Sequence, residues 1–178
     1  MGTINFDKLL LKTAFSCMAC DGDIDKREVK LIKKLHKENK TFGDIDINAE
    51  MDALLMAINK GGYQFLKEYF DELNISTLSE AEELMLIAVA IKTIKADDII
   101  EYSEVKFFKV IRSKLKIKNE DILEKYPDFE DYLEQDIISD SYLLRLQNDF
   151  LDNHISNEFE LINKIDKDLI SSFKNDNE

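Results

Sequence analysis

Apolar residues recur along most of this chain at spacings of three and four, the period of an amphipathic α-helix. This pattern predicts helices over residues 5–20, 26–40, 48–59, 63–73, 80–95 and 102–115. Weaker patterns predict short helices at 119–125 and 128–134, and two amphipathic helices at 139–151 and 156–173. Residues 9–20 and 84–91 are apolar on nearly every side, which is typical of helices buried within a core. We therefore expect an all-α protein with two central helices.

Local signals mark the ends of several of these helices. Asp25, followed by Glu28 three residues later, forms a capping-box pattern that predicts a helix start at residue 26. The glycine pair at 61–62 predicts a break between two helices. The helix over residues 80–95 is preceded by one of two capping boxes, Thr77 with Glu80 or Ser79 with Glu82.

An acidic turn occurs twice, with the two copies 76 residues apart. The first reads CDGDIDKRE over residues 20–28, and the second reads ADDIIEYSE over residues 96–104. The flanking apolar positions match in the same register without a gap. Because an internal repeat usually reflects a repeated structural unit, the fold is predicted to be a helical bundle of two helix–acidic turn–helix units plus C-terminal helices. If the units pack face to face, their carboxylates lie close together.

Six acids of the two turns form a candidate metal site, because oxygen ligands suit hard cations such as Ca²⁺ or Mg²⁺. The six residues are Asp21, Asp25, Glu28, Asp97, Glu101 and Glu104. The first turn begins like an EF-hand loop. However, Lys26 occupies the sixth position, where glycine is needed, and Ile32 occupies the twelfth, where a bidentate glutamate is needed. The EF-hand motif is therefore excluded.

Helix capping is the competing explanation of the same acids. The acids at the start of the second helix in each unit would be favourable there because the helix dipole attracts negative charge. Asp21 and Asp97 are harder to explain in this way, since each follows a helix and lies at its C-terminal end. The sequence therefore leaves two explanations of these acids open. They bind a cation or a polar ligand, or they only cap helices.

The first turn, which follows an apolar helix, resembles the signature of the TerB-like tellurite-resistance family, Ala-Asp-Gly-x-Ile/Val-x-x-x-Glu. The resemblance covers residues 5–117 and includes the second copy. In this chain Cys20 replaces the alanine, and Asp98 replaces the glycine of the second copy. The resemblance implies an all-α bundle with a divalent-cation site at Asp21, Glu28, Asp97 and Glu104, and with Asp25 and Glu101 as additional ligands.

The resemblance also implies a function, namely a non-enzymatic metal-binding or protein-interaction module of a bacterial stress response. Two alternatives stay open. One is a metal-dependent hydrolase that uses the paired carboxylates for acid–base chemistry. The other is a scaffold whose acids only cap helices.

Charge divides the chain unevenly. Residues 1–118 carry a net charge of −1 and residues 119–178 carry −12, out of −13 in total. We therefore predict a TerB-like helical domain at 1–118 and an acidic helical extension at 119–178. Such a charge argues against nucleic acid and anionic membranes as partners of the extension. The basic outer faces of the helices at 26–40 and 102–115 either oppose the acidic helices of the same or a neighbouring chain or are ordinary solvated faces, and the sequence leaves both open. A protein partner is expected, and the oligomeric state is left open.

The remaining features predict a cytoplasmic protein without redox or nucleophilic chemistry. No secretion signal is visible, and the longest apolar stretches fall short of the roughly 20 residues that span a bilayer. Cys17 and Cys20 form a C-x-x-C pair at the end of a buried helix, where they are expected to be small core residues. The two histidines, His36 and His154, lack the paired spacing of metal ligands.

Overall fold

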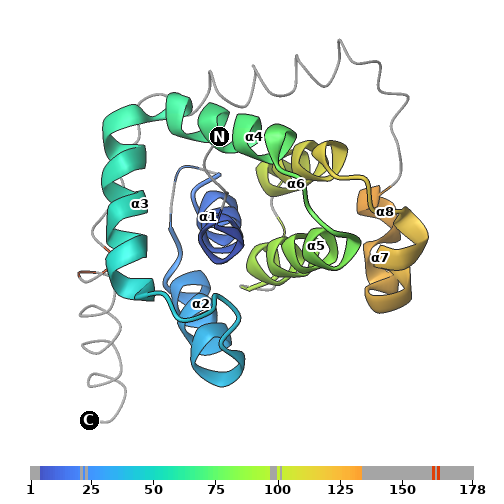
Figure 1. Cartoon of the computed structure of the whole chain (residues 1–178), viewed down its shortest axis with the longest axis horizontal. Helices are drawn as coiled ribbons and strands as arrows, with labels where there is room; N and C mark the ends of the chain where they lie inside the picture. Colours follow the sequence, from blue (N-terminus) through green and yellow to red (C-terminus); the bar gives the residue numbers. More distant parts are fainter. Residues whose placement is uncertain are drawn as a thin grey trace.

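The computed structural model describes residues 5–20, 22, 24–96, 100, 102–133, 162 and 164. Every regular element in these residues is a helix, which confirms the all-α prediction (Figure 1). The elements are α1 (Phe6–Met18), α2 (Lys26–Asn39), α3 (Ile47–Gly61), α4 (Tyr63–Ile75), α5 (Glu80–Ile94), α6 (Tyr102–Lys114), α7 (Asn119–Lys125), the 3₁₀ turn η1 (Pro127–Phe129) and α8 (Glu130–Leu133). The predicted helix at 139–151 lies outside the described residues. Of the one at 156–173, only residues 162 and 164 are described, and both are helical.

Capping interactions begin the helices where the sequence predicts them. The amide of Asp25 donates to Glu28 Oε2 at 3.0 Å, and the Asp25 side chain caps α2 in return. For α5 the capping box is the one formed by Ser79 and Glu82, with the Ser79 amide donating to Glu82 Oε2 at 2.8 Å. An N-cap contributes about 1 kcal/mol, so these local signals set the helix boundaries firmly. The glycine pair also separates α3 from α4, as predicted.

Helices α1 and α5 form the centre of the molecule. They pack against each other more extensively than any other pair of described helices. Figure 1 shows α1 surrounded by α2, α3, α4 and α5. Two pairs of matching positions in the repeat are equally buried: Leu10 and Ala14 in α1, and Leu86 and Ala90 in α5, are all completely inaccessible to solvent. The prediction that both apolar helices are central is confirmed, while the face-to-face packing of the two units stays a prediction.

Aromatic side chains hold the later helices on this centre. Phe70 of α4 packs on Phe107 of α6, with ring centroids 5.2 Å apart. Phe108 of α6 makes an edge contact with Phe129 of η1 at 5.2 Å, and Phe129 packs on Tyr132 at 4.5 Å. Residues 119–133, which open the predicted extension, therefore share the hydrophobic core with α6.

A buried polar network fixes the link between α6 and α7. Glu83 of α5, only 6% exposed, accepts hydrogen bonds from the amides of Lys116 at 2.7 Å and Ile117 at 2.6 Å. Arg112 donates to the carbonyl oxygens of Leu115 at 3.1 Å and Ile117 at 2.5 Å. These bonds satisfy backbone groups that would otherwise be left unpaired at the end of α6.

Ile162 is 1% exposed and belongs to the hydrophobic core, so the chain returns to the core at this residue after α8. None of the described helices combines the length and the apolar character that crossing a membrane requires.

Candidate functional site

Three of the six predicted site residues belong to the described part of the chain. These are Asp25, Glu28 and Glu104. The other three, Asp21, Asp97 and Glu101, lie outside the described residues, so the convergence of all six stays a prediction.

Glu28 and Glu104 occupy the same position in the two units, the third residue of α2 and of α6. Both carboxylates are buried, with exposed fractions of 6% and 7%. Glutamate is almost never fully buried without a partner, because removing its charge from water is costly. The burial of an acid at both matching positions is therefore a shared property of the two units.

Both glutamates act electrostatically on Cys17, in the last turn of α1. Cys17 is 1% exposed, and burial raises the pKa of its thiol well above the ordinary value. The negative charges of Glu28 and Glu104 raise this pKa further. One acid from each unit, 76 residues apart in the sequence, therefore influences the same thiol.

Buried polar groups continue from Cys17 along α1. Tyr69 of α4, fully buried, donates its hydroxyl to Thr13 Oγ1 at 3.0 Å, and Thr13 donates to the carbonyl oxygen of Leu9 at 2.9 Å. Burial raises the pKa of Tyr69, and the nearby Cys17 adds to this effect. Ser16 is also buried, and its Oγ makes no hydrogen bond with the described part of the chain. Cys17 and Tyr69 are therefore protonated at neutral pH, and a protonated thiol is a poor nucleophile.

Asp25 has a different environment from the two glutamates. Its Oδ1 accepts from the Arg27 amide at 2.6 Å and from Arg27 Nε at 3.0 Å, and its Oδ2 accepts from Arg27 Nη2 at 3.1 Å. The side-chain hydrogen bond from Arg27 is the main reason why the pKa of Asp25 is lowered. Asp25 thus acts as an N-cap in this structure, and its role as a metal ligand stays a prediction that requires a cation to displace Arg27.

The described donor set fits a hard cation in chemistry, but it is only part of a site. Two buried carboxylates provide the oxygen ligands that Ca²⁺ and Mg²⁺ prefer. Among the residues that the structure describes, no group of three or more His, Cys, Asp or Glu side chains is arranged to hold a metal ion. A complete site would need ligands from the acids that lie outside this part of the chain.

The sequence correctly indicates that Cys17 and Cys20 are buried core residues, and both are free thiols. It gives no indication that the charges of both glutamates act on Cys17. The available signal is weak: Cys17 precedes the acidic turn by one helical turn, and its match in the second unit is Thr93, another small, buried polar residue. Thr93 donates its hydroxyl to the carbonyl oxygen of Val89 at 3.0 Å.

Comparison of the chain with protein-family models, with curated proteins and with solved structures found no match. The resemblance to the TerB-like family therefore depends on the residues of the two acidic turns alone.

Proposed function

We propose that this chain is a TerB-like, non-enzymatic module that binds a divalent cation, Ca²⁺ or Mg²⁺, between its two acidic turns. One observation carries the proposal: Glu28 and Glu104 are buried at matching positions of α2 and α6, and the charges of both act on Cys17. Carboxylates held close together repel each other unless they are protonated, solvated or bridged by a cation. A bridging cation removes this repulsion and thereby stabilises the folded state.

The proposed biological role follows from the resemblance of the duplicated turn to the TerB-like signature. The protein acts in the cytoplasm in a bacterial stress response of the tellurite-resistance type. Cation binding at the junction of the two units then prepares a surface for a protein partner. An enzymatic role, such as metal-dependent hydrolysis, would require turnover of a phosphoester by the cation-loaded protein.

A purely structural role is the second candidate, and one observation favours it. Glu28 Oε2 accepts a hydrogen bond from the Asp25 amide, so this acid already completes a capping box. If capping were the whole role of the acids, removing their charge while keeping the hydrogen bond would change little.

Thermal unfolding of the variant Glu28→Gln/Glu104→Gln separates the two candidates. Glutamine at the third helix position still accepts a capping hydrogen bond, so the substitution removes charge and preserves capping. Glu82→Gln is a matched control because Glu82 holds the same position in the α5 capping box. Each protein is melted with Ca²⁺, Mg²⁺ or Mn²⁺ and with a chelator.

We expect cations to stabilise the wild type and the Glu82→Gln control, and to have no effect on the double variant. A cation at a hundredfold excess over its dissociation constant stabilises the fold by about 2.7 kcal/mol. In a protein of this size that corresponds to an increase in Tm of roughly 5–10 °C. An unchanged wild-type Tm, or an equal increase in the double variant, would leave capping as the better explanation. Asp21→Asn/Asp97→Asn then tests the two predicted ligands outside the described residues.

A further inference from the structure

The solvent-facing side of α2 is a continuous basic surface in an otherwise acidic protein. Six of its fourteen residues are basic, namely Lys26, Arg27, Lys30, Lys33, Lys34 and Lys37. Lys34 and Lys37 are exposed, and neither forms an ion pair with an acid of the described chain. Glu28 is buried, so Glu38 is the single acid of α2 that faces solvent. We call the exposed lysines Lys34 and Lys37 the basic face of α2.

The matching helix of the second unit does not repeat this pattern. At the positions that match Lys34 and Lys37, α6 has Val110 and Ser113. Arg112 of α6 donates to the carbonyl oxygens of Leu115 and Ile117. The duplication therefore does not by itself account for the basic face of α2.

An acidic surface lies at the other end of the molecule. Residues 119–133, from α7 to α8, contain six acids and one lysine. Glu120 and Glu124 are exposed and, being four residues apart, share one face of α7. Asp128 forms an ion pair with Lys95, whereas Glu120 and Glu124 form none within the described chain. We call Glu120 and Glu124, with the exposed Glu130 and Asp131, the acidic face of α7–α8.

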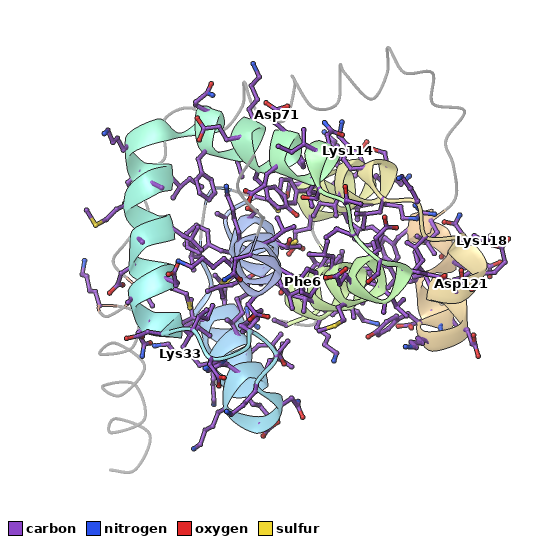
Figure 2. All side chains as sticks on the ribbon, viewed as in Figure 1. Phe6, Lys33, Asp71, Lys114, Lys118 and Asp121 are labelled. Atoms are coloured by element: carbon purple, nitrogen blue, oxygen red, sulfur yellow. The ribbon has the colours of Figure 1, made fainter. Side chains whose placement is uncertain are left out.

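The two faces belong to helices on opposite sides of the molecule (Figure 1). Figure 1 shows α2 and α7 on opposite sides of α5, and Figure 2 shows Lys33 and Asp121 at opposite ends of the molecule. Because they are separated in this way, the basic face and the acidic face do not neutralise each other within one copy. The basic face of one copy can contact the acidic face of a second copy.

We propose that the basic face of α2 binds the acidic face of α7–α8 of a second copy of this chain, giving a head-to-tail association. Helical spacing supports the fit, because residues three or four apart on a helix have Cβ atoms about 5–6 Å apart. Lys34 and Lys37 on one copy thus match the separation of Glu120 and Glu124 on the next. Because the two surfaces differ, the contact is heterologous and extends into rings or open chains of copies.

The net charge of the molecule favours a second copy over other acidic partners. A nucleic acid or an anionic membrane would be repelled by a chain that carries −13 overall. A second copy carries the same overall charge, but in the head-to-tail orientation it presents its acids directly to the lysines. Exposed charges separated by more than about 10 Å are screened at 0.1 M salt, so the association is strongest at low ionic strength.

Charge reversal in the full chain tests this proposal. The basic variant is Lys34→Glu/Lys37→Glu, and the acidic variant is Glu120→Lys/Glu124→Lys. The matched control is Lys60→Glu/Lys67→Glu, which reverses two exposed lysines away from both faces. Sedimentation velocity measures the apparent Kd of self-association for each protein at low and high salt, and circular dichroism checks that each variant is folded.

We expect the wild type and the control to associate at low salt and to dissociate at high salt. Each reversed variant alone should associate about tenfold more weakly or worse, because like charges then face each other. An equimolar mixture of the two reversed variants should recover association, since each provides the face that the other lacks. A wild type that stays monomeric at low salt and millimolar concentration would overturn the proposal. An equal loss in the control, or no recovery in the mixture, would overturn it as well.

Discussion

Replacing Glu83 should loosen the attachment of α7 to the rest of the molecule. One carboxylate oxygen of Glu83 accepts two backbone hydrogen bonds, at 2.7 Å from the Lys116 amide and at 2.6 Å from the Ile117 amide. A hydrogen bond to a charged group contributes about 1.5–3 kcal/mol, and a buried donor left without a partner costs about 1–3 kcal/mol. Glu83→Ala removes both bonds and should lower the free energy of unfolding by about 3–5 kcal/mol.

Glu83→Gln provides a graded comparison. The amide oxygen of glutamine can still accept from both backbone groups, but without the charge, so we expect a loss of about 1–2 kcal/mol. The exposed Glu80→Gln, in the first turn of the same helix, is the control and should unfold like the wild type. Urea unfolding gives these free energies, and hydrogen exchange of the Ile117 amide reports the local effect.

The order of the three variants is the informative result. If Glu83→Ala and Glu83→Gln destabilised the protein equally, the charge and not the acceptor oxygen would be the important property. If Glu83→Ala unfolded like Glu80→Gln, the proposed anchoring of residues 115–118 by this carboxylate would be wrong. Faster exchange confined to residues 115–133 would show that the bonds hold α7 and not the whole core.

Two further outcomes are expected. Gly43 has a φ of +64°, and a Cβ added there would lie 2.1 Å from Asp7 Oδ2, so Gly43→Ala should lower the free energy of unfolding by about 1–2 kcal/mol. Adding Asp7→Ala should relieve the clash but not the backbone strain; full recovery in urea unfolding would mean that strain is negligible. Because hydrogen bonds from Arg27 lower the pKa of Asp25 in the folded state, the stability that they provide is present above the ordinary pKa and is lost as pH falls below about 4. Asp25→Asn should therefore flatten the dependence of stability on pH between about 5 and 2, and an unchanged slope would contradict this.

Local signals explain why most of the helices could be predicted from the sequence. The capping boxes at Asp25 and Ser79 involve groups only three residues apart, so the chain itself contains the whole interaction. The predicted start of α3 differs slightly from the observed one, because the prediction did not include the N-cap at Asp46. Asp46 accepts from the amides of Asn48 and Ala49, both at 3.1 Å, and α3 therefore begins at Ile47, one residue before the predicted start.

Contacts between distant residues could not be predicted in the same way. The electrostatic effect of Glu28 and Glu104 on Cys17 depends on how three helices pack, and helical periodicity does not determine that packing. The approach of the acids of both turns to each other stays a prediction. The network of Glu83 likewise joins residues more than 30 positions apart, with no spacing pattern to reveal it.

Because both cysteines are buried, labelling of their thiols can report when the folded molecule opens. Cys17 and Cys20 are the two cysteines of the chain, and they are 1% and 0% exposed. A thiol-specific reagent reaches them only when α1 separates from its neighbours, so the rate of labelling measures the population of the opened molecule. Since the carboxylates of both units act on Cys17, any ligand that stabilises the closed arrangement of the two units should slow its labelling, without an engineered probe.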